Sequence, residues 1–519
     1  MTARSEPAGA AWVRRLFFVL ALLYVIPFWT VRYLPTTDGP CHTYNAWVIR
    51  QYGNVEKYPL FHQYYEVKLL PYPNWTDHGV MALLMLAVPP LVAEKLLVSG
   101  YMLLFLGGAW YLAGSVRPGE RWPAFLAFFF PYNQFFQFGF YNFSIGVALY
   151  LFAVGFWWRH RDQPNLRFAA KINLLLWLCW FSHVLSLILA LLSIAVLWLA
   201  TLRRESWRRH LLHVPILLPQ IGLPLWFFRA LGSDTVPVTK SYRDLLNFLV
   251  PPQVLFSFSE VQRTLAAAVA WGLLALTILT LWRETLRRRE GKWPGPRPED
   301  AFLLLVALAV CLYFFAPEGM SGGYLLTGRL SLFPYLLLIP WLAPRLGSRG
   351  RAAGITVLVV AALVNLGCLV VWYRVLGEEM RQFVAGLEPV RPSSRVLSLL
   401  FRRNTDALDV ADVLSHATGY VALEKGLVDW DNYEATLPYF PIRFREGVQL
   451  PQLDGVALGP GSMRVRLNRL AIDSVYTWKM PANELLRQRL HRDYVKVGER
   501  YGGELFERRS YRQGARDGG

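Results

Sequence analysis

The chain has 519 residues, of which 54 % are hydrophobic, 15 % aromatic and only 17 % charged. Soluble domains carry about 25 % charged residues, so this composition excludes an ordinary soluble protein. The net charge of +18 lies almost entirely before Tyr373, because from Arg374 onward 22 Lys and Arg face 19 Asp and Glu. Short basic loops mark the cytoplasmic side of membrane proteins, so we interpret this charge as a topology signal, which argues against nucleic-acid binding.

The first apolar run, from Arg14 to Leu34, has the length of a spanning helix, since about 20 residues cross the hydrocarbon core. Arg4, Arg14 and Arg15 lie on its amino-terminal side, and no small-residue cleavage site follows it. We therefore predict an uncleaved anchor preceded by a cytoplasmic N-terminus, residues 1–13.

The first loop, residues 35–91, is rich in aromatic and polar residues and is expected to lie at the outer membrane interface. Its apolar segment His78–Leu91 ends at Pro89-Pro90 and is short for a span. Runs of this length are more often re-entrant or interfacial, so we interpret the segment as an interfacial helix.

Further apolar runs complete a transmembrane domain over residues 14–373. They are expected to span at about 92–115, 123–136, 139–158, 168–182, 184–202, 210–230, 262–282, 300–316, 329–345 and 351–373. Basic loops lie at Arg117–Arg121, Arg159–Lys171, Arg203–Arg209, Arg283–Arg297 and Arg345–Arg351, and the alternate loops, which include 233–260 and 317–327, are poor in Lys and Arg. About eleven spans with a cytoplasmic N-terminus place every basic loop inside and the C-terminus outside.

After Tyr373 the pattern changes to that of a small α/β domain, expected over residues 374–511 and followed by a disordered tail, 512–519. Strands are expected at Ser394–Leu400, Ser474–Trp478, Asp493–Gly498 and Glu504–Arg509, and a helix at Val410–Leu423. A Gly502-Gly503 turn separates the last two strands.

The first loop opens with a candidate catalytic residue, Asp38, which precedes Pro40. Proline fits the first turn of a helix, so Asp38 would lie at its beginning, with His42 and Asn45 on one face. A carboxylate held there could act as a general base, or it could simply cap the helix. The residue types alone leave both interpretations open.

Other outward-facing polar residues are candidate binding groups. His183 is placed where two spans turn, and either has a structural role or binds an anionic or sugar ligand. Asn133 and Asn142 accompany aromatic residues, a combination that suits carbohydrate but equally suits the interfacial aromatic belt.

A glycine-rich outer loop contains Glu318 and Tyr324 and leads to Arg329 at the head of a span. An arginine on the outer side needs a partner, which is either a lipid phosphate or a carboxylate such as Glu318 or Asp38. No P-loop is present, which argues against ATP-driven work.

A divalent cation is not required by any of these patterns, because no Cys or His spacing typical of zinc sites occurs. The side chains that could ligate one are Asp38, His42, Asp77 and His78. The Asp77-His78 pair also opens the interfacial helix and could simply cap it, so metal dependence stays open.

Together, the acidic first loop with its interfacial helices, the many spans and the outer C-terminal domain resemble the GT-C superfamily. These membrane glycosyltransferases use polyprenyl-phosphate sugars and include protein O-mannosyltransferases and the lipid A aminoarabinose transferase. The resemblance covers residues 10–375. It departs from the family in one respect: members often have two adjacent acids, whereas Gly39-Pro40 follows Asp38.

The resemblance implies an inner-membrane glycosyltransferase with a lipid-linked donor, an unknown acceptor and a periplasmic C-terminal domain. Asp38 would be the catalytic base, and Arg329 and His183 would hold the donor phosphate. The rival functions are a non-catalytic assembly or anchoring protein and a lipid-linked glycan transporter. A transporter would need polar residues through several spans, and these spans are nearly free of them.

Overall fold

The computed structural model describes residues 8–203, 207–232, 234–290, 295, 297–343, 346–402, 412–450, 472–481 and 484–509. The expected tail, 512–519, and the first two residues of the expected helix Val410–Leu423 lie outside these ranges.

The chain divides into two compact units. We call residues 1–27, 98–136 and 141–370 the helical unit, and residues 28–97, 137–140 and 371–519 the mixed unit. The first loop and the C-terminal region, which lie at opposite ends of the sequence, therefore fold together in the mixed unit. Helices α6 (Pro90–Val116) and α18 (Ser348–Gly386) each begin in one unit and end in the other.

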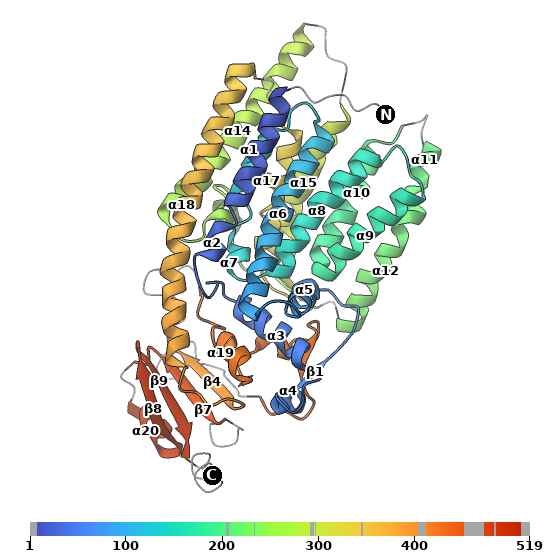
Figure 1. The fold of residues 1–519 in the computed structure, drawn as a ribbon. Helices are drawn as coiled ribbons and strands as arrows, with labels where there is room; N and C mark the ends of the chain where they lie inside the picture. The colour runs from blue at the N-terminus through green and yellow to red at the C-terminus, as the bar shows by residue number, and fades with distance from the viewer. Residues whose placement is uncertain are drawn as a thin grey trace. The chain divides into compact units, whose positions relative to one another are not determined.

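Long apolar helices make up most of the helical unit. Besides the two long shared helices, the elements that lie wholly or partly in it are α1 (Ala8–Leu23), α2 (Ile26–Trp29), η1 (Trp122–Phe129), α7 (Gln134–Gln137), α8 (Tyr141–His160), α9 (Leu166–Ser182), α10 (Val184–Ala200), α11 (Trp207–Leu211), α12 (His213–Leu231), β2 (Thr235–Val236), α13 (Tyr242–Leu249), η2 (Gln253–Leu255), α14 (Glu260–Arg289), η3 (Pro298–Asp300), α15 (Ala301–Phe315), β3 (Gly319–Met320), α16 (Leu326–Leu330), α17 (Phe333–Leu338) and η4 (Ile339–Trp341). Helices α8, α9 and α10 pack side by side (Figure 1).

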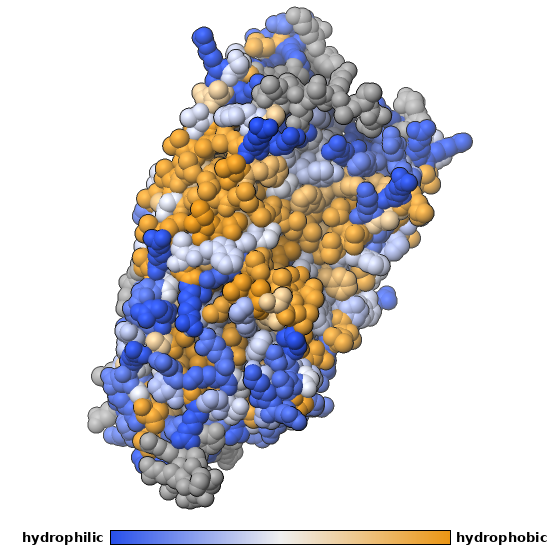
Figure 2. All heavy atoms as spheres, in the orientation of Figure 1, coloured by the Kyte–Doolittle hydropathy of each residue, from blue (hydrophilic) through white to orange (hydrophobic). Residues whose placement is uncertain are grey.

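Seven helices in the described part of the chain are long and apolar enough to cross a membrane, and α10 is a shorter apolar helix. Large apolar side chains on them face outward: Val19 is 55 % exposed, Trp271 70 % and Val357 66 %. Figure 2 shows apolar side chains gathered over these helices on the face drawn. Lipid covers such a surface without cost, so the structure is that of a polytopic membrane protein.

The predicted span Arg14–Leu34 is interrupted between α1 and α2 and its helix ends at Trp29, and two later predicted spans consist only of short helical segments. Residues 123–136 form η1 and α7 with a turn between them, and residues 329–345 contain α16, α17 and η4. Each segment contains prolines, such as Pro131 and Pro340, and proline removes a backbone donor and obstructs a regular helix. Almost every described residue in both segments is buried or half-buried, which is the setting where irregular backbone is tolerated at membrane depth.

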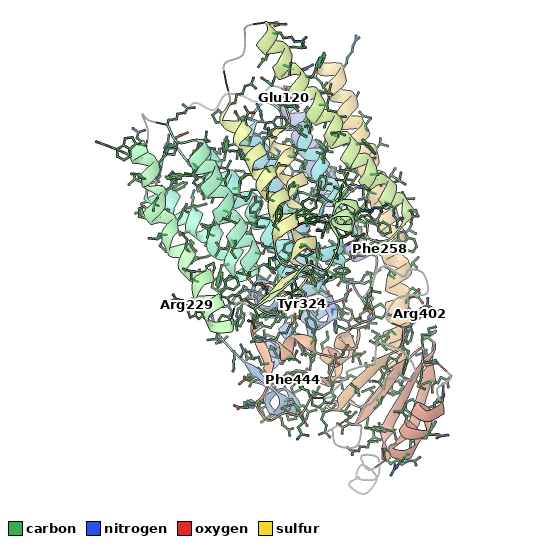
Figure 3. The ribbon with its side chains drawn as sticks, turned by 180° about the vertical axis from the view of Figure 1, so that it is seen from behind. Glu120, Arg229, Phe258, Tyr324, Arg402 and Phe444 are labelled. Atoms are coloured by element: carbon green, nitrogen blue, oxygen red, sulfur yellow. The ribbon has the colours of Figure 1, made fainter. Side chains whose placement is uncertain are left out.

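In the helical unit, a basic loop and the loops poor in Lys and Arg lie at opposite ends of the helices, as the charge pattern predicts (Figure 3). Glu120, in the basic loop after α6, lies at one end of the helices (Figure 3). Arg229, near the end of α12, and Tyr324, in the glycine-rich loop, lie at the other end. The loop expected in the cytoplasm and those expected outside are therefore at opposite ends of this unit.

The mixed unit combines short helices with two sheets, the β1–β6 pair and a five-stranded sheet. Its elements are α3 (Gly39–Gln51), α4 (Pro59–Tyr64), β1 (Tyr65–Val67), α5 (Thr76–Leu84), β4 (Arg395–Leu400), α19 (Thr418–Lys425), β5 (Val428–Asp429), η5 (Tyr433–Thr436), β6 (Ile442–Phe444), β7 (Ser474–Trp478), α20 (Glu484–Asp493), β8 (Tyr494–Arg500) and β9 (Gly503–Arg508). The order in the main sheet is β5-β4-β7-β9-β8, with β4 parallel to both neighbours and the β8–β9 hairpin antiparallel.

The four strands expected from the sequence are confirmed as β4, β7, β8 and β9, and the expected turn joins the last two. Gly502 has a φ of 83° there, which glycine adopts at little cost. The expected helix up to Leu423 is shorter than predicted, because residues 413–417 form turns and α19 begins at Thr418.

A strand pairing in the mixed unit joins the first loop to the C-terminal region, and the length of α5 shows that this helix does not span the membrane. Strand β1 pairs antiparallel with β6, with Tyr65 opposite Phe444. Helix α5 has nine residues, a length of about 14 Å at 1.5 Å per residue, so it is too short to cross a bilayer.

Candidate functional site

Asp38 does not cap the helix that it precedes. It occupies the N-cap position of α3, with Pro40 in the first turn as expected, yet its side chain makes no capping hydrogen bond. Instead, the Tyr433 hydroxyl donates a hydrogen bond of 2.8 Å to Asp38 Oδ2, and His416 Nε2 lies 3.6 Å from Asp38 Oδ1. Of the two interpretations left open by the sequence, helix capping is therefore excluded by the geometry.

A short segment, residues 137–140, holds the backbone around Asp38. The amide of Thr37 donates to the carbonyl of Gln137, and that of Asp38 donates to the carbonyl of Phe138, both at 3.0 Å. Gly139 has a φ of 82°, and a Cβ there would lie 2.6 Å from the amide nitrogen of Asp38. Glycine is therefore required at this position for the close approach.

Burial raises the pKa of Asp38, opposed by the positive charges of His416 and His42 and by the Tyr433 hydrogen bond. Asp38 is only 7 % exposed. His416 has a second acidic partner, because its Nδ1 lies 3.2 Å from Asp431 Oδ2. Burial alone would favour neutral His416, but the Asp431 and Asp38 carboxylates raise its pKa to about 9.

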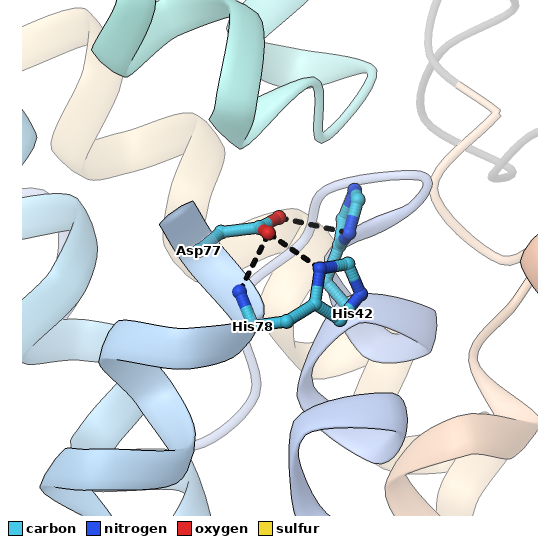
Figure 4. A group of neighbouring side chains, drawn as sticks. All are labelled: His42, Asp77 and His78. Atoms are coloured by element: carbon cyan, nitrogen blue, oxygen red, sulfur yellow. Dashed lines mark hydrogen bonds and ion pairs between the residues drawn. The ribbon is translucent and has the colours of Figure 1, made fainter. Parts of the chain in front are cut away.

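A second group, which we call the ion cluster, consists of His42, Asp77, His78 and Glu434. His42 Nδ1 lies 2.9 Å from Asp77 Oδ2 and 2.7 Å from Glu434 Oε1. His78 Nδ1 lies 2.6 Å from Asp77 Oδ1, and His78 Nε2 lies 2.8 Å from Glu434 Oε2. Figure 4 shows the Asp77 carboxylate in contact with both imidazole rings.

The ion cluster is fully enclosed, with side chains at most 4 % exposed. Burial would favour neutral groups, but the two carboxylates raise the pKa of His78 to about 9 and that of His42 well above its usual value. The two rings in turn lower the pKa of Asp77 and, to about 2, that of Glu434, although burial of these carboxyls acts in the opposite direction. Opposite charges at these distances compensate the desolvation cost of one another.

An amide pair supports the cluster. Asn45 Nδ2 donates to Glu434 Oε2 at 2.5 Å, and Asn432 Nδ2 donates to Asn45 Oδ1 at 2.7 Å. His42 and Asn45 thus reach the same carboxylate from α3, in agreement with the prediction that they share a helix face.

The C-terminal region supplies residues that the sequence did not single out: His416, Asp431, Asn432, Tyr433 and Glu434. A signal was present, because four of them occur in one short acidic and amide-rich stretch beside Asp429. Nothing in that stretch specifies that it pairs with a loop almost 400 residues earlier.

The remaining candidate residues lie in the helical unit, where Arg329 and His183 contact each other. Arg329 Nη1 lies 3.1 Å from His183 Nε2, and its guanidinium lies 5.5 Å from the ring centre of Phe143. Glu318 accepts a hydrogen bond from Thr327 and forms an ion pair of 3.5 Å with Lys240.

The other candidates in the helical unit differ in their surroundings. The Asn133 side chain accepts hydrogen bonds from the amides of Phe135 and Phe136, and therefore holds the turn before α7. Asn142 is buried within α8, and Tyr324 is 60 % exposed. A cavity of 440 Å³ in this unit, lined by residues such as His160 and Lys171, contains none of the candidate site residues.

Comparisons with known proteins rest on the fold alone. No protein-family profile and no curated protein matches the sequence. The structure of ArnT from Cupriavidus metallidurans bound to undecaprenyl phosphate is similar, with a TM-score of 0.50, 12 % identity, and coverage of 96 % of this chain and 98 % of that one. The apo structure of the same protein gives a TM-score of 0.47 and 11 % identity with the same coverage. The chain thus has a fold similar to that of ArnT.

Proposed function

We propose that this protein is a membrane glycosyltransferase that moves a sugar from a polyprenyl-phosphate donor to an extracytoplasmic acceptor, with Asp38 as general base. The observation that carries the proposal is the state of Asp38. Its carboxylate is buried, has a raised pKa and is held by two side chains instead of capping its helix. A buried carboxyl whose pKa is raised by burial and which has specific charged partners is typical of a catalytic group.

The fold supports the choice of donor. The similar ArnT structure contains undecaprenyl phosphate, and the apolar helices here give the chain access to a lipid-linked substrate. We therefore propose an inner-membrane enzyme with a cytoplasmic N-terminus and a periplasmic C-terminal region. The acceptor is a glycan, lipid or protein group with a hydroxyl or amine.

In the proposed reaction, Asp38 takes the proton from the acceptor while the acceptor attacks the anomeric carbon of the sugar. The bond from that carbon to the phosphate oxygen breaks, polyprenyl phosphate leaves, and the anomeric configuration inverts. A base works best when its pKa approaches the working pH, so the raised pKa of Asp38 suits this role.

Tyr433 and His416 act as positioning residues in this scheme. The Tyr433 hydroxyl fixes one carboxylate oxygen, and His416, itself held by Asp431, lies beside the other. Each carboxylate oxygen has a second lone pair, so Asp38 can still accept a proton from a substrate. Arg329 and His183 are proposed, from the family resemblance, to bind the donor phosphate, because a guanidinium pairs well with phosphate oxygens.

The experiment is transfer or hydrolysis of radiolabelled polyprenyl-phosphate sugars by purified protein in lipid nanodiscs. Asp38→Asn should lower the rate by about 10²–10⁴-fold, the usual contribution of general base catalysis. Asp234→Asn, at an exposed position in the helical unit, is the matched control and should retain full activity. A stably inserted Asp38→Asn protein with normal transfer would refute the base assignment, and no transfer from any donor by wild type would favour a non-catalytic anchoring protein.

A further inference from the structure

The ion cluster has the composition of a metal site. One ligand atom each from His42, Asp77 and His78 lie within 4.8 Å of one another, and all three residues are buried. A carboxylate oxygen of Glu434 lies 2.7 Å from His42 Nδ1, so a second carboxylate borders this group of three. The four groups come from α3, α5 and η5, all within the mixed unit.

Some atoms of the ion cluster lie within hydrogen-bond distance of each other but lack the orientation of a hydrogen bond. His78 Nδ1 makes no hydrogen bond within the described part of the chain, although Asp77 Oδ1 is 2.6 Å away. Glu434 Oε1 likewise makes none there, although His42 Nδ1 is 2.7 Å away. Ligand lone pairs that converge on a common centre give this arrangement, whereas hydrogen-bonded pairs point at each other.

The outer contacts of the cluster are also those of a metal site. His78 Nε2 faces Glu434 Oε2 at 2.8 Å, so its other ring nitrogen is the one left to face Asp77. Histidine ligands of metals almost always donate their second N–H to a carboxylate or carbonyl, which fixes the ring. Asn45 holds the same Glu434 oxygen from the opposite helix.

We propose that His42, Asp77 and His78 hold one divalent cation of the zinc class, with Glu434 as the carboxylate that fixes the two rings beside it. Two imidazoles with one carboxylate suit zinc better than magnesium or calcium, which prefer oxygen ligands alone. Complete burial of the three residues leaves no opening for substrate, so the cation is structural, and Glu434 links its site to the C-terminal segment 432–436. This inference is independent of sugar transfer.

Binding of the cation in exchange for two protons conserves the charge of the cluster. Without the cation, two imidazolium rings face two carboxylates, and the net charge is zero. A divalent cation replaces the two Nδ1 protons, which leave to solvent, and the net charge remains zero. Ligands around zinc lie about 3.3 Å apart, since the bonds measure about 2.0–2.1 Å, so the rings and carboxylates move apart by about half an ångström.

The test is the metal content and thermal stability of the purified full-length protein in detergent, prepared without chelator. Elemental analysis should find about one zinc per chain, with loss of at least about nine-tenths of it in His78→Gln and Asp77→Asn. His62→Gln, an exposed histidine of the same loop, is the matched control and should retain the metal. A strong chelator should lower the melting temperature of wild type by several degrees, and added zinc should restore it.

The chelator experiment uses only the wild-type protein, so it remains informative if a variant fails to fold. Wild type that purifies without metal and whose melting temperature does not respond to added zinc or manganese would overturn the proposal in favour of a purely ionic cluster. Metal retained in full by a folded His78→Gln protein would overturn the assigned ligands. Neither readout depends on glycosyltransferase activity, so failure here is distinguishable from failure of the proposed function.

Discussion

Tyr433 donates a hydrogen bond to Asp38 across 395 positions of sequence, at 2.8 Å. The next residue, Glu434, contacts His42 one helical turn after Asp38. Two consecutive residues of the C-terminal region therefore contact two different groups of the first loop. Tyr433 orients the proposed base, and Glu434 belongs to the ion cluster. This gives the C-terminal region a direct part in the candidate site.

Loss of the Tyr433 hydroxyl should change the pH dependence of transfer. The hydrogen bond lowers the pKa of Asp38, so Tyr433→Phe should raise that pKa and move the acidic limb of the rate profile to higher pH. A hydrogen bond to a charged group is worth about 1.5–3 kcal/mol, which corresponds to about one to two pH units. The measurement is kcat/KM against pH, with Tyr242→Phe, an exposed tyrosine, as control. A lower rate with an unchanged profile would mean that Tyr433 has only a packing role.

The ion pairs of His416 should make stability depend on pH. Because the folded-state pKa of about 9 lies above the value of about 6.5 for an unfolded chain, the contribution is fully present below pH 6.5 and disappears as pH rises through 9. His416→Gln should therefore destabilise the protein by roughly 2–3 kcal/mol at about pH 6 and much less at about pH 10. Thermal unfolding in detergent measures this, and His491→Gln, an exposed histidine of α20, is the control. A stability difference that is constant over the whole range would contradict the charged state of His416.

Gly139→Ala should disturb Asp38 through the backbone. The new Cβ would meet the amide nitrogens of Asp38 and Gly39, both at 2.6 Å, and the positive φ adds strain of about 1–3 kcal/mol. We expect a lower melting temperature and a loss of transfer greater than the loss of folded protein. Gly222→Ala, within α12 with nothing near the added Cβ, is the control. Normal activity of Gly139→Ala would show that the segment 137–140 does not position Asp38.

Arg329 should affect donor binding more than the chemical step. Removal of a guanidinium from a phosphate typically costs about 1.5–3 kcal/mol, so Arg329→Ala should weaken polyprenyl phosphate binding by roughly 10–150-fold, and Arg329→Lys by less. Calorimetric titration with polyprenyl phosphate measures the affinity directly. Arg263→Ala, at a side chain that is 49 % exposed, is the control. Unchanged affinity in Arg329→Ala would reject the phosphate-binding role.

Local sequence patterns sufficed for features that depend on neighbouring residues. The alternation in Ser474–Trp478 and the glycine turn at Gly502 predicted strands and a hairpin that the structure contains. The run of apolar residues at about 92–115 predicted a membrane helix, which the structure contains as Pro90–Val116. These features follow from periodicity and backbone preference, which act over a few residues.

Only the tertiary structure decided how distant groups combine. The sequence alone left Asp38 as either a base or a cap, because both roles require the same residue type at the same place. Its partners, His416 and Tyr433, lie beside it because β1 pairs with β6 and α3 packs against α19 in the fold. The predicted spans 123–136 and 329–345 likewise turned out to be broken, because surrounding protein accommodates prolines that the apolar pattern does not reveal. Hydrophobicity determined where the chain enters the membrane, whereas long-range packing determined which charges meet, since a buried charge is stable only beside the partner that the fold provides.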